Sequence, residues 1–247
     1  MTVQLLNDIL YLTIMKPIKK YKFDITIAII NYNRSKFIDR SVRSCLDQSL
    51  SGKTLELIVV DDNSNDESIS YLNSHKTIHN KSNLSIHSFN LIRNKKNMGT
   101  GYCSNLAVAK SRGKYFMRVD SDDYLNRFAA DNMTDILNYN DNYGYVYCDH
   151  YRTDEWGLKQ KIIKLKSKKI LLSHGAGILF KTDLIKKVGN YNKKLREAED
   201  HDLILRLNKI SKGFYLPVPL YRYYIHNDNI SNSGNRKKYI KLINKKK

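Results

Sequence analysis

The feature that most constrains the fold is a regular alternation of strand-like and helix-like segments between Asp24 and Asp123. DITIAIINY (24–32) is a β-branched apolar run, and SKFIDRSVRSCLDQ (35–48) then spaces its apolar residues along one face of a helix. Further strands are predicted over 55–62, 84–90 and 114–120, with helical segments starting near 65 and 99. Such alternation predicts right-handed crossovers and an α/β fold with a mainly parallel sheet covered by helices on both faces.

The second half of the chain loosens this pattern. The expected elements are a helix (126–140), a strand (143–149), a lysine-rich excursion of short strands or loop (159–169), a turn and strand (174–180), an acid-led helix (197–210) and a closing segment (214–231).

The chain shows no internal repeat and no low-complexity linker. We therefore expect one domain over 24–233, formed by two halves, 24–123 and 124–233, with an N-terminal lead-in (1–23) and a basic tail (234–247).

Polar residues follow three of the predicted strands directly. NYNR (31–34) follows the first strand, DDNSND (61–66) the second and DSDD (120–123) the fourth, whereas the third ends in the basic RNKKNMG (93–99). Ligands of open α/β sheets bind at the carboxyl ends of the parallel strands. We expect these segments to line one site of a nucleotide-binding type of sheet.

Asp120, Asp122 and Asp123 place three carboxylates within four residues. Like charges this close raise one another's pKa unless a cation or strong hydrogen-bond donors lie among them. Carboxylate oxygens are preferred ligands of Mg²⁺ and Mn²⁺, which often complete their coordination with substrate phosphates. A turn or cap explains one Asp but not three, so the motif predicts a metal and diphosphate site.

Three other sites allow two interpretations each. Asp61 and Asp62 either accept hydrogen bonds from a nucleoside or cap the following helix. The acids at 197, 199, 200 and 202 either stabilise the first turn of a helix or include a general base. His226 is either a metal or phosphate contact or, as a lone histidine more often is, neither.

The net charge of +19 is concentrated in the second half, above all in KQKIIKLKSKK (159–169) and NRKKYIKLINKKK (235–247). Such runs hold nucleic acid, anionic lipid or a phosphorylated substrate by charge, or they form a solvated face.

The three cysteines show no CxxC spacing, which indicates neither a disulfide framework nor a zinc site and is typical of a reducing cytosol. No stretch approaches the ~20 apolar residues of a membrane span. The start of the chain carries its positive charges after a short apolar run, which favours an amphipathic lead-in, touching a membrane surface, over a signal peptide.

Five segments, taken in order, resemble the family 2 glycosyltransferases of the GT-A fold. The resemblance runs from about Asp24 to Ser233 and is carried by IAIINYNR (27–34), ELIVVDDNSND (56–66), NMGTGYCSNLAVAKSRGKYFMRVDSDD (97–123), GNYNKKLREAEDHDLILRL (189–207) and LYRYYIHNDNIS (220–231). The third of these contains a DXD motif. The resemblance implies that 24–123 binds a nucleotide-sugar and that 124–233 binds the acceptor.

The resemblance also implies roles for individual residues. Asp62 would bind the nucleotide base, most often uracil, with Ile30, Asn31, Tyr32 and Gly99 around it. Asp122 and Asp123 would lie at the ribose and at the Mn²⁺ or Mg²⁺ that bridges the diphosphate, with Asp120 supporting them. His226 would contact the metal or the diphosphate, and Asp200 would be the catalytic base.

The implied reaction is an inverting, single-displacement transfer of one sugar from a nucleotide-sugar, most simply a UDP-sugar, to a hydroxyl of a glycan or lipid-linked acceptor. A cytoplasmic protein that contacts the anionic cytosolic face of a membrane would suit the basic second half. The chain departs from the family pattern at one pair of positions. Members of the family often carry an Arg-Asn pair where this chain has Ser104 and Asn105. A diphosphate or loop contact made by that arginine would then have to come from Arg93, Lys95 or Lys96. It also lacks a Gln-x-x-Arg-Trp motif, and its one tryptophan is Trp156, which argues against a processive synthase.

Two rival functions have weaker support from the sequence. A basic nucleic-acid-binding protein without enzymatic activity would explain the pI of 9.7, but no nucleic-acid module is recognisable and the carboxylates would repel phosphates. A sugar-phosphate nucleotidyltransferase would need a Gly-rich, basic loop after the first strand, for which NYNRSK (31–36) is a poor match.

Overall fold

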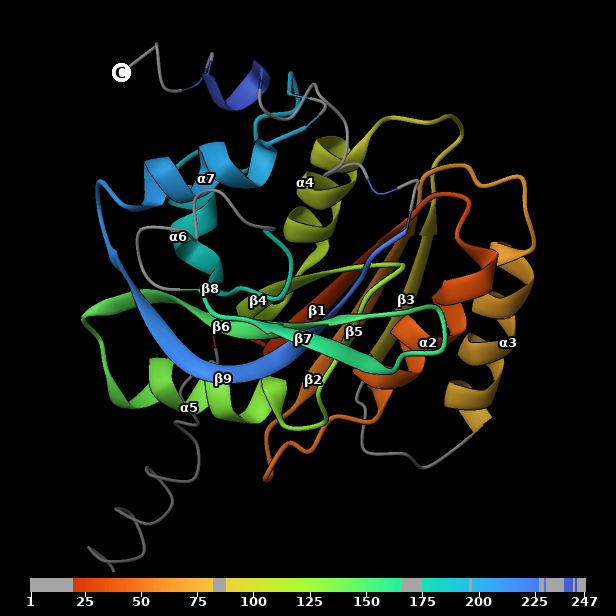
Figure 1. The fold of residues 1–247 in the computed structure, drawn as a ribbon, viewed down its shortest axis with the longest axis horizontal. Helices are drawn as coiled ribbons and strands as arrows, with labels where there is room; N and C mark the ends of the chain where they lie inside the picture. Colours follow the sequence, from red (N-terminus) through yellow and green to blue (C-terminus); the bar gives the residue numbers. More distant parts are fainter. Residues whose placement is uncertain are drawn as a thin grey trace, which may run out of the picture.

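A single twisted sheet, with nine strands among the described residues, forms the centre of the protein (Figure 1). The computed structural model describes residues 20–81, 88–165, 175–195, 197–226, 229, 238–241 and 243. The strand order is β3-β2-β1-β4-β8-β6-β9-β5, and β7 pairs with β6 beside this path. The predicted lead-in falls mostly outside the described residues, as do most of the basic tail and the end of the lysine-rich segment.

The first half forms the parallel part of the sheet. Its elements are β1 (Phe23–Asn31), α2 (Ser35–Leu46), β2 (Leu55–Asp61), α3 (Ser68–Lys81), β3 (Ser88–Arg93), α4 (Thr100–Lys110) and β4 (Gly113–Asp120). β1 lies between β2 and β4 and is parallel to both, and β3 is parallel to β2 at the edge. The polar segments after β1, β2 and β4 are thereby brought to one end of the sheet, as the sequence predicts.

The second half adds the mixed part of the sheet. Its elements are β5 (Tyr124–Leu125), α5 (Ala129–Tyr139), β6 (Tyr143–Thr153), β7 (Lys159–Ile163), β8 (Leu179–Lys181), α6 (Thr182–Lys187), α7 (Glu199–Leu207) and β9 (Lys212–Tyr224). β8 runs antiparallel to both β4 and β6, and β9 runs parallel to β6. The short β5 and α6 were not expected from the sequence, because neither is long enough to show a hydrophobic period.

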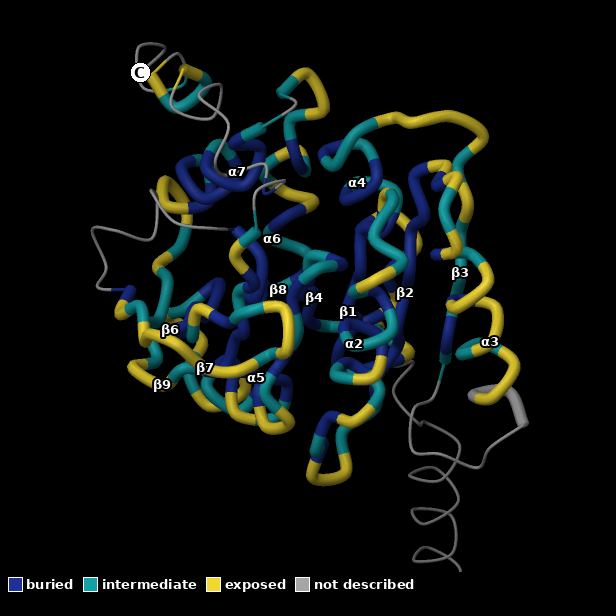
Figure 2. The backbone as a smooth tube through the Cα atoms, turned by 45° about the vertical axis from the view of Figure 1, so that its right-hand side comes forward, coloured by how far each residue is buried: buried dark blue, intermediate teal, exposed yellow. Residues whose placement is uncertain are grey.

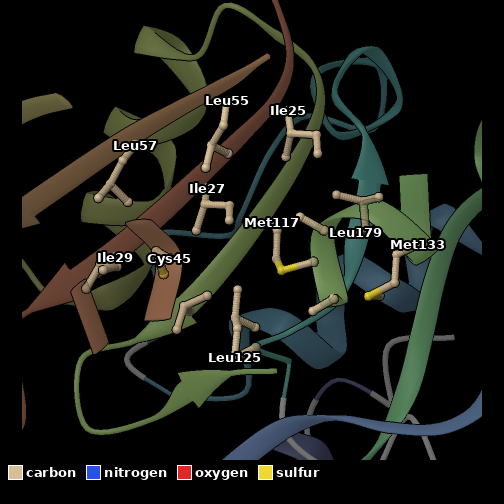
Figure 3. Packing of buried hydrophobic residues seen from close by; sticks show 14 of the residues in the cluster. Ile25, Ile27, Ile29, Cys45, Leu55, Leu57, Met117, Leu125, Met133 and Leu179 are labelled. Atoms are coloured by element: carbon tan, nitrogen blue, oxygen red, sulfur yellow. The ribbon is translucent and has the colours of Figure 1, made fainter. Parts of the chain in front are cut away.

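Two hydrophobic clusters cover the two faces of the sheet, and β1 contributes to both. Ile25, Ile27 and Ile29 point to the face covered by α2 and α5, whereas Ala28 and Ile30 point to the face covered by α4, α6 and α7. This follows from the alternation of side chains along a strand. Figure 3 shows the first cluster, in which Met117 of β4 and Leu179 of β8 pack beside the β1 side chains. β1 is therefore almost wholly buried and apolar at most of its positions, which is typical of a strand with two covered faces.

Burial decreases toward the edges of the molecule (Figure 2). β1 and β2 are almost wholly buried, whereas the described residues of α3 and those of β7 are largely exposed. Among the described residues, no helix combines the length and the apolar character that crossing a bilayer requires.

Candidate functional site

A cleft opens at the carboxyl ends of β1, β2 and β4, facing the start of α7. Among the described residues, its lining combines six carboxyl side chains with two arginines, so this lining is acidic although the chain is strongly basic. The lining residues are Ile30, Tyr32, Arg34, Asp62, Asn97, Gly99, Thr100, Arg118, Asp120, Ser121, Asp122, Gly175, Glu197, Glu199, Asp200, Tyr223 and Asn229. Carboxylates from both halves of the chain thus lie around one space.

Asp62 follows β2 directly and is 3% exposed, and the loop before α4 folds around it. Its Oδ1 accepts hydrogen bonds from the Met98 backbone N–H (2.8 Å) and from Asn94 Nδ2 (2.7 Å), and its Oδ2 accepts one from the Gly99 N–H (2.8 Å). Gly99 has φ +86, a conformation that costs little only for glycine. Asp62 therefore organises this wall of the cleft, and both Asp62 and Gly99 line it.

The segment after β1 contributes Ile30 and Tyr32 to the lining, but Asn31 points elsewhere. Asn31 Nδ2 donates to Asp61 Oδ1 (2.8 Å) and to Ser64 Oγ (3.1 Å), and the Asn31 carbonyl accepts from the Asp62 N–H (2.8 Å). Its contribution is to hold the turn after β2 and so to place Asp62.

Asp120 and Asp122 both line the cleft. Asp122 Oδ2 lies 3.0 Å from His226 Nε2 and 3.3 Å from Arg34 Nε. Burial opposes ionisation of Asp122, but the hydrogen bond from His226 and the charge of Arg34 outweigh it and hold its pKa below the ordinary value. The structure therefore brings together Asp122 and His226, which are 104 positions apart in the sequence.

Asp123 is not in the cleft, in contrast to the expectation that it is a metal ligand. It is 1% exposed, its Oδ2 accepts from the Tyr221 hydroxyl (2.8 Å), and its Oδ1 accepts from the Tyr224 N–H (2.8 Å). Burial, followed by the charges of Asp122 and Asp120, raises its pKa well above the ordinary value. With both oxygens engaged by β9, Asp123 ties the DSDD turn to that strand, and we do not assign it a metal.

Asp200 lies in the first turn of α7 and is 4% exposed. Ala198, two residues before Asp200, adopts φ +62. This backbone conformation costs about 1 kcal/mol or more for a residue with a Cβ, and such strained residues cluster at functional sites. Gly175 lies against the Asp200 side chain so closely that a Cβ there would come within 2.0 Å of Asp200 Cβ. The position of Asp200 thus depends on the strained start of α7 and on the lack of a side chain at Gly175.

Arg118 joins the two walls of the cleft. This residue of β4 is 4% exposed, its NH1 donates to Glu199 Oε1 (2.7 Å), and its Nε lies 3.3 Å from Asp120 Oδ1. Burial raises the pKa of Glu199, and the charge of Arg118 opposes that rise. We did not single out Arg118 from the sequence, although a charged residue inside the apolar run KYFMRVD (114–120) was a signal for it.

The departures from the family pattern have partial explanations. The Ser104 hydroxyl is buried in α4 and has no hydrogen-bond partner within the part of the chain that the structure describes. Asn105 exchanges two hydrogen bonds with the Tyr191 backbone (2.8 Å each). Arg93 NH2 donates to the Ser64 carbonyl (3.0 Å), so this arginine holds the turn after β2. The arginines that line the cleft are Arg34 and Arg118.

The residues present are suited to a metal that arrives with a diphosphate. Within the described residues, no three His, Cys, Asp or Glu side chains form a preassembled metal cage. Mg²⁺ is, however, commonly held by one or two carboxylates together with substrate phosphates and water, and Mn²⁺ prefers the same oxygen ligands. Asp120 and Asp122 offer such a pair of carboxylates. Asp122 also lies beside Arg34 and His226, so its environment favours the ionised form that a metal ion requires.

Comparisons with known proteins indicate a family for this chain. Residues 26–192 match the family model described as Glycosyl transferase family 2. Chondroitin synthase of Escherichia coli is 27% identical over 84% of this chain and 30% of its own length. An uncharacterized glycosyltransferase of Rickettsia prowazekii is 27% identical over 85% of this chain and 66% of its own length. The chain thus spans about a third to two thirds of these relatives.

Solved structures share the fold. TarS of S. aureus in complex with UDP superposes with a TM-score of 0.70 at 17% identity, over 89% of this chain and 64% of that chain. The mannosyltransferase PcManGT of Pyrobaculum calidifontis, in complex with GDP-Man and Mn²⁺, gives a TM-score of 0.64 at 16% identity, over 85% and 59% of the two chains. Both likenesses confirm the predicted α/β sheet of the GT-A type.

Proposed function

Because the chain belongs to glycosyl transferase family 2, we propose that it transfers one sugar from a nucleoside diphosphate sugar to a hydroxyl of a glycan or lipid-linked acceptor, with inversion at the anomeric carbon. The observation that carries the proposal is the cleft itself, in which Asp62, Asp120 and Asp122 of one half face Asp200 of the other. A nucleic-acid-binding protein without enzymatic activity is no longer favoured, because the chain belongs to a family of enzymes.

The donor would lie along the carboxyl ends of β1, β2 and β4. Asp62, with Ile30, Tyr32 and Gly99 around it, would receive the base, and Asp120 and Asp122 would face the ribose and diphosphate. A uridine nucleotide is the simplest donor to propose, since TarS was solved with UDP, although PcManGT was solved with GDP-Man. When bound, Mn²⁺ or Mg²⁺ supplies Lewis-acid stabilisation of the charge on the departing diphosphate. Asp122 and Asp120 would hold it, with His226 beside them.

The chemical step requires a base on the acceptor side. The Asp200 carboxylate would take the proton of the acceptor hydroxyl while that oxygen bonds to the anomeric carbon. The bond from this carbon to the diphosphate oxygen breaks on the opposite face, and its electron pair leaves with the nucleoside diphosphate. A carboxylate in hydrogen-bond reach of the acceptor contributes roughly 10²- to 10⁴-fold to such a step. Transfer of a single sugar per encounter and a cytoplasmic location remain predictions.

Thermal unfolding with UDP, GDP and UDP-sugars, each with and without Mn²⁺, tests donor binding. A ligand at 100 times its Kd that binds the folded state alone adds about 2.7 kcal/mol to the free energy of unfolding. We expect a Mn²⁺-dependent rise in Tm with a uridine nucleotide, and loss of its Mn²⁺-dependent part in Asp122→Asn. No rise with any nucleotide, together with a salt-sensitive rise with RNA, would overturn the proposal.

Asp200→Asn tests the base separately. We expect this variant to keep the nucleotide-dependent rise in Tm but to lose about 10²-fold or more in turnover of the donor. Asp202→Asn, in the same turn of α7, is the matched control, because Asp202 pairs with Arg206 (2.7 Å) and is not in the cleft lining. Equal turnover in the two variants would place the base elsewhere.

A further inference from the structure

The turn between β6 and β7 presents large apolar side chains to solvent. Trp156 is 80% exposed, Leu158 is 65% exposed, and Ile162 on β7 is 41% exposed. We call residues 154–158 with Ile162 the hairpin tip. Single exposed apolar residues are ordinary, but a tryptophan and a leucine two positions apart on one exposed turn form an apolar patch that needs a physical explanation.

The tip holds these side chains outward on a well-braced backbone. Asp154 Oδ1 accepts from the N–H groups of Trp156 (3.1 Å) and Leu158 (2.8 Å), and Gly157 turns with φ +82. From the neighbouring elements, the Tyr124 hydroxyl donates to the Gly157 carbonyl (2.8 Å) and Arg40 NH1 donates to the Glu155 carbonyl (3.1 Å). The exposure of Trp156 and Leu158 is therefore a property of a fixed turn and not of a loose loop.

Exposed cations lie on the two strands that lead to the tip. Lys159, Lys161 and Lys164 follow it on and after β7, and all three are exposed, as is Arg152 on β6. The acids nearby are Asp154, whose carboxylate is engaged by the turn, and Glu155. A lysine-bearing edge strand by itself protects a sheet from pairing with another chain, which would explain the lysines of β7. It does not explain why the adjacent turn exposes a tryptophan.

We propose that the hairpin tip is a membrane anchor that inserts Trp156 and Leu158 among the headgroups of an anionic bilayer. Tryptophan is enriched at the membrane interface, where its ring is partly apolar and its N–H can bond to polar groups. Lysines next to such a ring meet the negative surface, and each adds about fivefold to binding at moderate ionic strength. Exposed apolar side chains with cations on the adjoining strands suit an anionic bilayer better than a second copy of this chain, whose tip would carry the same charge.

The tip also lies close to the cleft, which gives the anchor a use. Arg40, which bonds the tip, lies over the Tyr224 ring (5.8 Å), and Tyr224 stacks on His226 (4.9 Å), the residue that contacts Asp122. A bilayer touching the tip is therefore a few side chains from the diphosphate end of the cleft. This placement favours an acceptor that is presented at the membrane surface, an inference that rests on the proposed function.

Trp156 is the only tryptophan of the chain, so intrinsic tryptophan fluorescence reports on this residue alone. We expect vesicles of phosphatidylserine and phosphatidylcholine to shift its emission to the blue, and lipids carrying a bromine on the upper acyl chain to quench it. Vesicles of phosphatidylcholine alone should produce neither effect. Binding in co-sedimentation without any change in emission would mean that basic segments elsewhere make the contact, and it would overturn the proposal.

Variants separate the anchor from general charge. We expect Trp156→Ser and Leu158→Ser each to weaken vesicle binding in co-sedimentation about tenfold, and Tyr139→Ser, which removes an 87% exposed aromatic from α5, to change it less than twofold. The double change of Lys159 and Lys161 to Gln should weaken binding more than the double change of Lys186 and Lys187 to Gln on α6, which removes the same number of charges. Equal effects of tip and control variants would overturn the proposal.

The same fluorescence experiment tests two other binding partners of the tip, a second copy of this chain and an oligosaccharide. A blue shift that grows with protein concentration in the absence of lipid would indicate self-association. A blue shift with oligosaccharide and no vesicles would indicate a glycan-binding platform. Either would overturn the membrane proposal. The tip variants should retain the Mn²⁺-dependent rise in Tm with UDP, so failure of the anchor is distinguishable from failure of the proposed activity.

Discussion

At the scale of the residue, Arg118 decides how the two walls of the cleft meet. Its guanidinium lies between Asp120, at the end of β4, and Glu199, at the start of α7, and stacks near the Tyr191 ring (5.7 Å). The side chain has little contact with bulk water, since it is 4% exposed. Breaking a buried ion pair by removing one member is costly because the other charge is left uncompensated.

We expect Arg118→Met to lower the free energy of unfolding by about 3–5 kcal/mol, because Glu199 then stays buried without its cation. Urea unfolding followed by circular dichroism measures this loss. The double variant Arg118→Met/Glu199→Gln should recover part of it.

Arg43→Met is the control for this prediction, since Arg43 pairs with Asp39 on the surface of α2 and such pairs contribute about 0–1 kcal/mol. A loss in Arg118→Met no larger than that in Arg43→Met would show that the Arg118 network carries no stability.

At the scale of the element, Lys53 and Ser51 hold α5 to the loop before β2. Lys53 bonds to Asp131 and lies 2.8 Å from Asp135 Oδ1, and the Ser51 hydroxyl donates to Asp131 Oδ2 (2.7 Å). Asp131 and Asp135 are four positions apart on α5 and would otherwise repel each other. Burial opposes ionisation of Asp131, but the bonds from Lys53 and Ser51 hold its pKa below the ordinary value.

We expect Lys53→Met to cost about 1 kcal/mol at pH 7. A depressed carboxyl pKa stabilises the folded state above the unfolded pKa of about 3.9, and this stabilisation is lost as the pH falls through the folded value. The difference between wild type and variant should therefore shrink below about pH 4. Urea unfolding from pH 7 to pH 3 measures it, with Lys209→Met as the control. A difference that stays constant over this range would exclude the ion pair as its cause.

At the scale of the whole molecule, the two expected halves share their interior. β4 of the first half pairs with β8 of the second, and one hydrophobic cluster includes Ile25 and Met117 as well as Leu179 and Tyr221. Neither half could expose its part of this cluster to water without losing the apolar burial that stabilises it. The division at residue 123 is therefore one of role in the proposed function and not of folding.

We expect thermal unfolding of the chain to be a single cooperative transition, with a calorimetric enthalpy equal to the van't Hoff enthalpy. UDP with Mn²⁺ should raise the temperature of the whole transition. Two resolved transitions, of which only one responds to the nucleotide, would show that the halves unfold separately.

Much of the fold was predictable because its information is local. The strands at 24–32, 55–62 and 114–120 were predicted close to their observed bounds, since each is a short, mainly apolar run that ends in polar residues. β7 and β8 were harder to predict because a short strand shows its pattern over too few residues, and their pairing depends on β6 and β4. Of the candidate residues, Asp62, Asp120, Asp122 and Asp200 do line one cleft, and their chemical roles stay predictions.

The sequence by itself determined the alternation of strands and helices and, through it, the end of the sheet at which polar residues gather, because side-chain periodicity and chain connectivity dictate both. Only the tertiary structure decided which carboxylate faces the cleft. Asp123 is turned away from it by Tyr221, 98 positions later in the chain, and Arg118 joins Asp120 to Glu199 across 81 positions. Contacts of this kind depend on how strands and helices that are distant in the sequence pack together, and no local pattern of residues predicts that packing.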